Sequence, residues 1–202
     1  MTQPTEPIEF AVAADEITER FAAGSTLSPA VLEELQKICP TNTEAQSLAE
    51  HGRDWWPLAM HWALQGTTPR KPGAVCTPNT TEQVAAIVAV CSTHDLPLTV
   101  AGGRSGVCGS AVPLYGGVVL DVTAMQGIVS VDQLSGIVEV LPGTFGPDFE
   151  NELQSRYALT VGHFPQSFDI STVGGWVACR GAGQYSTRYG KIEDMVVGLE
   201  VV

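Results

Sequence analysis

The sequence predicts a mixed fold of helices and strands, and three stretches carry that prediction. A strand–helix–strand unit spans residues 74–100, a glycine-rich loop at 101–110 precedes another strand at 118–121, and a hairpin at 128–141 precedes a helix that begins near Pro147. Of the 202 residues, 44% are hydrophobic and 16% are charged, so the chain can form a core. This composition excludes disordered, collagen-like and coiled-coil proteins.

The N-terminal region contains one helix with clear end signals. Ser28 stands at the N-cap position, Pro29 opens the helix, and apolar residues recur at helical spacing as Val31, Leu35 and Ile38. The tryptophan-rich stretch at 54–71 that follows is typical of a packed entry segment. We therefore predict an N-terminal helical and entry segment over residues 1–66 and a regular domain over residues 67–202.

The regular domain begins with the strand–helix–strand unit. Residues 74–78 indicate a short strand closed by a proline, and Thr80 to Gln83 offer a capping box for a helix over about 81–93. One apolar stripe of this helix is predicted to pack on a sheet and comprises Val84, Ile87, Val88 and Cys91. Residues 96–100 then return as a strand.

The loop Ala101-Gly102-Gly103-Arg104-Ser105-Gly106-Val107-Cys108-Gly109-Ser110 follows that strand directly. Glycines without a Cβ let backbone N–H groups approach an anion, so the loop is a candidate phosphate cradle. Its spacing matches neither G-x-G-x-x-G nor the P-loop, and a strand follows it instead of a helix. The alternative, a glycine-rich surface turn, stays open on this motif alone.

A second motif lies in residues 162–190, which read GHFPQSFDISTVGGWVACRGAGQYSTRYG. Ser171 and Thr172 offer hydroxyl groups just before a short helix, an arrangement that suits a polar, bulky cofactor. Three bases, Arg180, Arg188 and Lys191, gather here without an acid between Asp169 and Glu193. They indicate a local positive site for phosphate, or they merely offset the neighbouring acids on the surface.

Composition and charge exclude several kinds of function. The formal net charge of −12 disfavours nucleic-acid binding. The N-terminus lacks a secretory signal pattern and no apolar run is long enough for a membrane span, so we expect a cytoplasmic protein. Five cysteines without a C-x-x-C pair favour neither disulfides nor a metal site, and we expect small buried thiols at Cys39, Cys76, Cys91, Cys108 and Cys179.

Taken in order, the motifs VAGGRSGVCG, VVLD and SFDISTVGGW, with the following RYG and IEDMVV, resemble the FAD-binding domain of the p-cresol methylhydroxylase and vanillyl-alcohol oxidase superfamily. The second motif is most similar to the alkylglycerone-phosphate synthase branch. The resemblance covers residues 73–202. It implies an α+β domain of the PCMH type with two subdomains and with FAD between them.

The resemblance also implies the cofactor-binding residues. The first segment, which meets the pyrophosphate, comprises Thr99, Val100, Ala101, Gly102, Gly103, Arg104 and Ser105. The second comprises Pro165, Gln166, Ser167, Phe168, Asp169, Ile170 and Ser171, and the third comprises Cys179, Arg180, Gly181 and Ala182.

Arg104 stands where several relatives carry a histidine bonded covalently to the flavin, so we expect FAD to be held non-covalently. Cys108 is an alternative covalent anchor, although a packed thiol is the expected role. His163 could face the flavin, or it is a structural histidine. No catalytic residue is predicted, because the resemblance implies that these residues lie mostly in a C-terminal part of the domain that follows Val202.

Three functions remain open. The first is the FAD-binding portion of an enzyme similar to alkylglycerone-phosphate synthase, which exchanges an acyl for an alkyl group on a dihydroxyacetone phosphate ester. The second is an FAD-linked dehydrogenase of a 2-hydroxy acid such as D-lactate or glycolate, and the third is a remnant without activity. We expect a small-molecule substrate and a homodimer of the full-length protein. The resemblance further implies that Gly198 to Val202 form an edge strand, and we expect the chain alone to be poorly stable.

Overall fold

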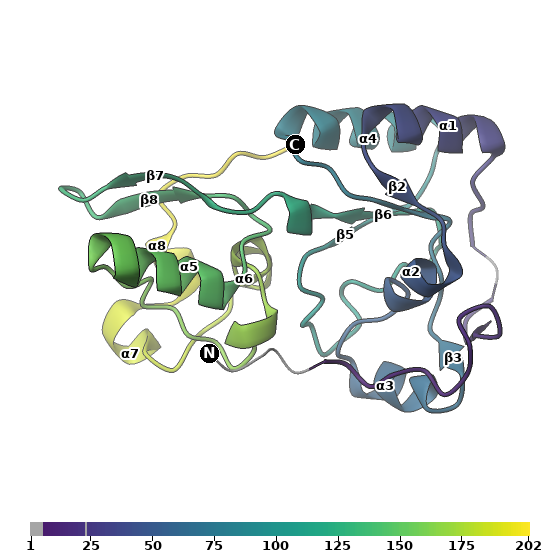
Figure 1. The fold of residues 1–202 in the computed structure, drawn as a ribbon, viewed down its shortest axis with the longest axis horizontal. Coiled ribbons are helices and arrows are strands. Elements are labelled where there is room, and N and C mark those ends of the chain that lie inside the picture. The colour runs from purple at the N-terminus through teal and green to yellow at the C-terminus, as the bar shows by residue number, and fades with distance from the viewer. Residues whose placement is uncertain (1–5, 23) are drawn as a thin grey trace. The chain divides into compact units, whose positions relative to one another are not determined.

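The computed structural model describes residues 6–22 and 24–202, which form two compact units (Figure 1). We call residues 6–122 the N-terminal unit and residues 123–201 the C-terminal unit. Both combine helices with strands, as the sequence predicts.

A four-stranded sheet forms the centre of the N-terminal unit. Its spatial order is β2 (Thr41–Asn42), β4 (Ala74–Cys76), β6 (Val118–Asp121) and β5 (Leu98–Ala101). Strands β4, β6 and β5 are parallel and β2 is antiparallel to β4. Thr99 lies opposite Val119, and Ala101 lies opposite Asp121. The glycine loop therefore leaves the carboxyl end of β5, and the chain must return to the other end of the sheet before β6 begins.

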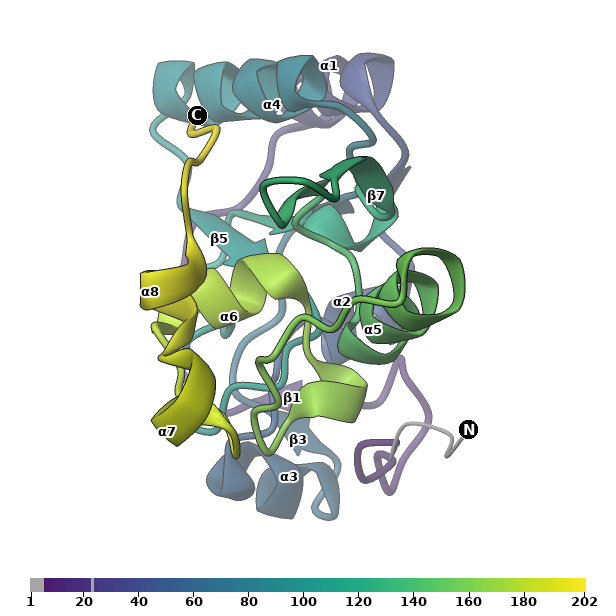
Figure 2. The same cartoon turned by 90° about the vertical axis from the view of Figure 1, so that its left-hand side faces the viewer.

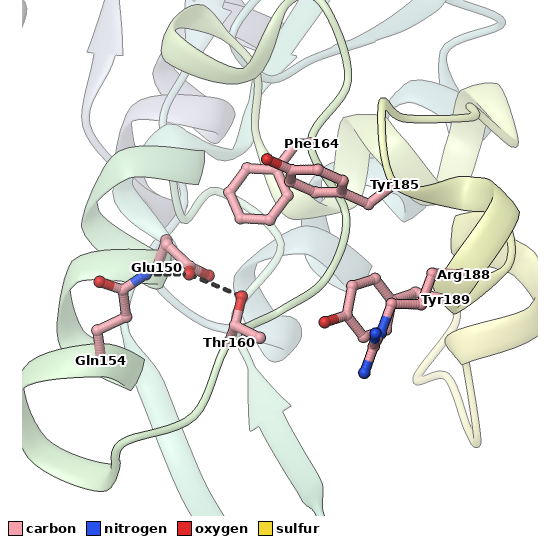
Figure 3. Close-up of a pocket in the computed structure, with 7 residues that line it drawn as sticks. All are labelled: Glu150, Gln154, Thr160, Phe164, Tyr185, Arg188 and Tyr189. Atoms are coloured by element: carbon pink, nitrogen blue, oxygen red, sulfur yellow. Dashed lines mark hydrogen bonds between the residues drawn. The ribbon is translucent and has the colours of Figure 1, made fainter.

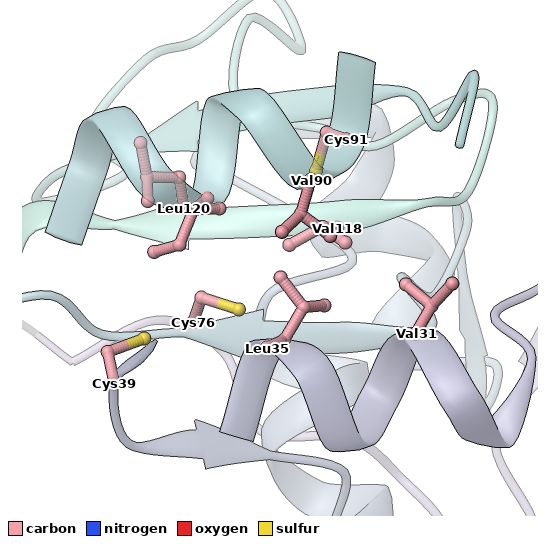
Figure 4. Close-up of a cluster of buried hydrophobic side chains, with 9 residues drawn as sticks. Val31, Leu35, Cys39, Cys76, Val90, Cys91, Val118 and Leu120 are labelled. Atoms are coloured by element: carbon pink, nitrogen blue, oxygen red, sulfur yellow. The ribbon is translucent and has the colours of Figure 1, made fainter. Parts of the chain in front are cut away.

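Helices cover both faces of this sheet, because buried side chains alternate along its strands. On one face, helices α1 (Pro29–Ile38) and α4 (Thr81–Thr93) pack on the apolar side chains of Cys76, Val118 and Leu120 (Figure 4). On the other face, Leu48 of α2 (Ala45–Glu50) packs against a smaller cluster of Val75, Ala101 and Val119. The central strands β4 and β6 are buried on both sides, as expected for parallel pairing, whereas Val100 in the edge strand β5 is exposed.

The predicted helix starts are confirmed by their caps. The Ser28 hydroxyl accepts a hydrogen bond from Val31 N at 3.4 Å, and the Thr80 hydroxyl accepts one from Gln83 N at 3.3 Å. The Gln83 side chain, however, accepts from Asn79 N rather than from Thr80 N, so the predicted capping box closes one residue earlier.

The predicted stripe of α4 is wrong at one position. Ile87 and Cys91 are buried as expected, but the third buried residue is Val90, and Val88 is only half-buried. Val90 joins Ile87 and Cys91 in the cluster with α1, which widens the buried face of the helix beyond the stripe that faces the sheet.

The tryptophan-rich stretch is packed within the N-terminal unit. Helix α3 (Pro57–Ala63) carries Trp62, whose ring meets Trp56 edge-on at 5.3 Å and Phe21 edge-on at 5.8 Å between centroids. Nearby, β1 (Thr18–Glu19) pairs in parallel with β3 (Thr67–Thr68). The stretch is therefore an integral part of this unit and not a linker.

The C-terminal unit begins after the 3-10 turn Val122–Ala124 with the predicted hairpin of β7 (Ile128–Asp132) and β8 (Ile137–Val140). Its helices are α5 (Gly146–Glu152), which continues as a π-helical turn over Leu153–Tyr157, then the 3-10 turn Phe168–Ile170, α6 (Val173–Cys179), α7 (Ser186–Tyr189) and α8 (Ile192–Met195). The hairpin lies over α5 and α6 in both views (Figures 1 and 2). The core of this unit consists of Phe149, Leu153, Trp176 and Ile192.

The cysteine prediction is partly wrong. Cys39, Cys76 and Cys91 are buried in the N-terminal unit, where burial and the neighbouring thiols raise the pKa of Cys76 to about 12. Cys108 and Cys179 are exposed, because the first lies in the glycine loop and the second at the end of α6.

The C-terminal strand implied by the resemblance is absent from the structure. No strand is assigned within residues 196–202, and Val197, Leu199 and Val201 are 66–81% exposed. The described part of the chain pairs no other strand with this segment, which leaves its backbone without a ladder.

Candidate cofactor-binding site

The first predicted segment leads from strand β5 into the glycine loop of the N-terminal unit. Thr99, Val100 and Ala101 belong to the strand, and the chain from Gly102 to Gly109 forms neither helix nor strand. Gly102 to Gly106 are half-buried, while Val107 and Cys108 are exposed. The loop therefore stands at the carboxyl edge of the parallel strands, where ligands commonly bind in open sheets.

The backbone amides of this loop are open to an anion. Among residues 6–22 and 24–202, no hydrogen-bond partner is present for the amides of Gly103, Ser105 and Gly106. Consecutive unpaired N–H groups in a glycine-rich turn form a concave donor set for phosphate. These residues thus fit the pyrophosphate of FAD, with the amides rather than a lysine as the donors.

The Arg104 side chain turns away from such an anion. Its Nη1 donates to the carbonyl oxygen of Glu50, and its backbone has a left-handed φ of 51°. Burial lowers the pKa of Arg104, which the carboxylates of Asp121 and Glu50 oppose. The guanidinium is therefore engaged inside the N-terminal unit, and the backbone of Arg104 is the part of this residue left for a ligand of the loop.

The second predicted segment, residues 165–171, forms a tight turn in the C-terminal unit. The amide of Phe168 donates to Pro165 O, and the amide of Ile170 donates to Ser167 O, both at 3.0 Å. The buried Ser171 hydroxyl donates to Ser167 O at 2.7 Å and accepts from the Trp176 indole at 2.6 Å. This hydroxyl is thus committed to holding the turn. Gln166 and Asp169 are the exposed members of the segment.

The third predicted segment ends helix α6 in the same unit. Arg180 is the left-handed C-cap, with a φ of 51°, and its Nε donates to Glu193 at 2.5 Å. That contact raises the pKa of Arg180 and lowers the pKa of Glu193. The arrangement matches the alternative interpretation of the basic cluster, because Arg180 offsets a neighbouring acid. Cys179 and Ala182 are exposed.

A hollow of about 380 Å³ in the C-terminal unit is lined by none of the three predicted cofactor-binding segments, but it includes Arg188 of the predicted basic cluster (Figure 3). The buried carboxylate of Glu150 accepts from Gln154, from the Thr160 hydroxyl at 2.7 Å and from Val161 N at 2.9 Å. The remaining lining residues are Phe164, Tyr185, Arg188 and Tyr189, and Arg188 stacks its guanidinium on the Tyr189 ring at 5.3 Å. Arg188, Tyr185 and Tyr189 supply hydrogen-bond donors to this hollow, and its one acid, Glu150, is already hydrogen-bonded.

His163 is buried without hydrogen bonds. Its side chain is 1% exposed, and its ring lies 5.1 Å from that of Trp176 between centroids. Neither ring nitrogen has a partner within the described residues, and burial lowers the pKa of His163. The sequence indicated either a flavin contact or a satisfied structural histidine, and the structure has a buried ring without a hydrogen-bond partner among the described residues.

Replacing His163 with phenylalanine should therefore reduce the acid sensitivity of this unit. Because the pKa of His163 is lowered in the folded state, the unfolded state takes up a proton first as the pH falls. The contribution of neutral His163 to the free energy of unfolding is therefore full above the unfolded pKa of about 6.5 and is lost as the pH falls below it. The loss is at most about 1.4 kcal/mol per pH unit for one group. Urea denaturation at pH 7.5 and pH 5.5 measures it, and an unchanged pH dependence in His163→Phe would contradict this account.

No group of three or more His, Cys, Asp or Glu side chains in the described part of the chain is arranged to hold a metal ion. Among the same residues, no helix combines the length and the apolar character needed to cross a membrane.

Comparison with known proteins gives the family. The model of the FAD binding domain family matches residues 72–202. Alkyldihydroxyacetonephosphate synthase of Trypanosoma brucei brucei is 33% identical over 155 residues, which are 74% of this chain and 24% of that protein. The glycolate oxidase subunit GlcD of Bacillus subtilis is 34% identical over 131 residues, 65% of this chain and 28% of that protein.

Solved structures show the same fold. A structure of alkyldihydroxyacetonephosphate synthase has a TM-score of 0.83 at 23% identity and covers 98% of this chain and 36% of its own. A structure of p-cresol methylhydroxylase has a TM-score of 0.66 at 21% identity, with 79% of this chain and 31% of its own chain covered. The chain thus spans between about a quarter and about a third of the length of these relatives. It belongs to the FAD binding domain family, with the α+β fold of the p-cresol methylhydroxylase type and with FAD as its cofactor.

Proposed function

We propose that the chain is the FAD-binding portion of a flavoenzyme similar to alkylglycerone-phosphate synthase, with the FAD pyrophosphate on the glycine loop. The observation that carries this proposal is the set of unpartnered amides at Gly103, Ser105 and Gly106, within the described residues, at the carboxyl edge of the sheet. An anion there meets backbone donors and no side-chain acid of the loop itself. FAD, when bound, supplies the electron-accepting or adduct-forming ring of the reaction.

The residues of this chain then bind and orient the cofactor. In the proposal, Thr99 to Ser105 hold the pyrophosphate, and the segments from Pro165 to Ser171 and from Cys179 to Ala182 meet other parts of FAD. Arg104 in place of an anchoring histidine supports non-covalent binding, because its guanidinium is occupied by Glu50 O. The exposed thiol of Cys108 keeps a second anchor open as a competing outcome.

The substrate is a separate part of the proposal. An acyl-for-alkyl exchange on a dihydroxyacetone phosphate ester is supported by the relative from Trypanosoma brucei brucei, and a 2-hydroxy-acid dehydrogenase by the similarity to GlcD. We favour the first because the STVGGW motif and its flanks are most similar to that branch. A remnant without activity is the third candidate, and it predicts a chain that takes up no FAD.

The remaining parts of the proposal concern organisation and surroundings. We propose an entry segment over residues 1–66 and an FAD-binding domain over residues 67–202, which the family match from residue 72 supports. The negative net charge supports a protein that does not bind nucleic acid. We further propose a small-molecule substrate, a homodimer of the full-length protein and a cytoplasmic location.

An absorbance spectrum of the purified chain, before and after acid precipitation, tests the function. We expect the two visible bands of a flavin and the release of FAD into the supernatant, because arginine stands at position 104 in place of an anchoring histidine. Colour that stays in the pellet would contradict non-covalent binding and point to Cys108 or His163. A colourless chain that also fails to take up added FAD would support the remnant.

A further inference from the structure

The segment from Glu50 to Trp56 reaches the glycine loop directly. Trp55 N donates to the carbonyl oxygen of Arg104 at 3.2 Å, while Arg104 Nη1 donates back to the carbonyl oxygen of Glu50. One of these hydrogen bonds is donated by the segment and the other by the loop, and they connect residues about fifty positions apart in the sequence. They fix the backbone on both sides of Arg104, at the residue where the loop adopts a left-handed conformation.

Two further side chains of the segment lie against the glycines of the loop. A Cβ on Gly106 would come within 3.3 Å of Asp54 Oδ2, and a Cβ on Gly109 would come within 3.4 Å of the Trp56 ring. Asp54 Oδ1 itself accepts from Trp56 N at 2.9 Å. Asp54 and Trp56 thus lie beside Gly106 and Gly109, although the closest neighbour of a Cβ on Gly106 would be Ser110 Oγ at 2.6 Å.

Asp54 is a buried carboxyl group whose role is not explained by an ion pair. It is 3% exposed, and its Oδ2 has no partner that meets hydrogen-bond geometry among the described residues. Burial raises the pKa of Asp54, which the backbone amides of Trp56, Ala111 and Gly109 oppose. A buried carboxyl is costly unless donors surround it, and the donors around this one are Trp56 N at 2.9 Å and the amides of Ala111 and Gly109.

The segment is in turn anchored on the sheet. Both ring nitrogens of His51 are hydrogen-bonded. Nδ1 lies 2.8 Å from Ser47 O, and Nε2 lies 2.9 Å from Asp121 Oδ2. Asp121 ends strand β6, directly opposite the last residue of β5. Arg53, also buried, forms an ion pair with Glu50 at 2.9 Å. The segment is therefore a rigid support beneath the point where the loop leaves the sheet.

We propose that Asp54 and Arg104 are positioning residues that hold the glycine loop in the shape in which its free amides meet a phosphate. The inference rests on the proposed function, and it extends the cofactor site to a segment that lies before the matched family domain at residue 72. Asp54 acts on Gly106 and the amides beyond it, and Arg104 acts on the first half of the loop. Neither side chain touches the cofactor in this account.

Limited digestion with trypsin tests the loop without any cofactor. Cleavage after Arg104 requires that its side chain leave Glu50 O, whereas cleavage after the buried Arg70 requires opening elsewhere in the N-terminal unit. In Asp54→Ala we expect the rate of cleavage after Arg104 to rise at least tenfold relative to that after Arg70. Glu34→Ala is the control, because Glu34 is an exposed residue of α1 that pairs only with His94 at the end of α4 in the described structure. It should leave the ratio of cleavage after Arg104 to cleavage after Arg70 unchanged.

Titration of the full chain with FAD is the second measurement. We expect Asp54→Ala and Arg104→Met to bind FAD at least tenfold more weakly than the unmodified chain. Arg104→Lys keeps a cation that can reach Glu50 O, so it should stay within about threefold of the unmodified chain. Lysine and methionine at position 104 both bear the cost of the left-handed backbone. A difference in FAD affinity between these two variants therefore reports the side-chain charge and its hydrogen bond to Glu50 O.

The outcomes separate the two proposals. If the unmodified chain binds no FAD, the proposed function fails, while the cleavage ratio still decides whether Asp54 holds the loop. If FAD binds equally well in all variants, or if cleavage after Arg104 and Arg70 rises equally in Asp54→Ala, the positioning role is overturned. A selective rise in cleavage, with weaker FAD binding that lysine restores at position 104, supports it.

Discussion

Replacing Gly117 with alanine should strongly destabilise the N-terminal unit. Gly117 has a φ of 71°, and a Cβ there would fall on the carbonyl group of Pro97. That carbonyl cannot move freely, because it accepts from Val118 N at 2.9 Å, where β6 starts beside β5. The left-handed conformation alone costs an alanine about 1–2 kcal/mol, and displacing the strand adds to it. We expect a loss of about 3 kcal/mol or more, a large part of a typical domain stability.

Urea denaturation measures this loss, and the chain contains a matched control. Gly136, in the turn of the hairpin, has a φ of 67°, and no atom lies within 4 Å of the position of its Cβ. In Gly136→Ala the left-handed conformation is unfavourable but the new Cβ overlaps no other atom, so the free energy of unfolding should fall by only about 1–2 kcal/mol. Equal losses in the two variants would mean that the contact with Pro97 contributes nothing.

Local signals in the sequence predicted the elements whose causes are local. Helix α1 begins at Pro29 because Ser28 caps it, and α4 begins at Thr81 because Thr80 caps it. The hairpin and the start of α5 followed from alternation and from Pro147 in the same way. The caps join residues three positions apart and the hairpin pairs residues at most twelve positions apart, so a sequence displays these features directly.

The features that the sequence missed depend on distant contacts. The burial of Val90 in place of Val88 follows from the position of α1, and the exposure of Cys108 and Cys179 follows from where their segments lie on the surface. The support of the glycine loop by Asp54 joins residues about fifty positions apart. The stretch HGRDWW contains an acid and two bases but no motif that would have linked them to the loop.

The candidate site was predictable to the same degree. Glycine content and a preceding strand indicated a loop with open amides, and the structure has such amides at Gly103, Ser105 and Gly106 within its described residues. Side-chain roles were less accessible. The Arg104 guanidinium is bonded to Glu50 O, Arg180 pairs with Glu193, and the Ser171 hydroxyl holds its own turn. Hydrogen-bonding capacity is visible in a sequence, but the partner that uses it is set by the fold.

A single negative charge in the glycine loop should abolish most FAD binding. Ser105 is half-buried in the loop, and its hydroxyl has no partner among the described residues, so aspartate can replace it with little change to the fold. A carboxylate about 4–8 Å from the pyrophosphate would oppose it by roughly 2–4 kcal/mol at an effective dielectric constant of about 20. We therefore expect Ser105→Asp to bind FAD about 100-fold more weakly than the unmodified chain in a fluorescence titration.

Ser105→Asn is the matched control, because asparagine has the shape of aspartate without its charge. Its affinity for FAD should stay within about tenfold of that of the unmodified chain, and its urea midpoint should match that of Ser105→Asp. The difference in FAD affinity between the two variants should also become smaller at high salt, since salt screens part of the repulsion between half-buried charges. If aspartate and asparagine weaken the binding of FAD equally, the pyrophosphate does not lie on this loop. Only the negative charge of a nearby pyrophosphate would make the two side chains differ in their effect on FAD affinity.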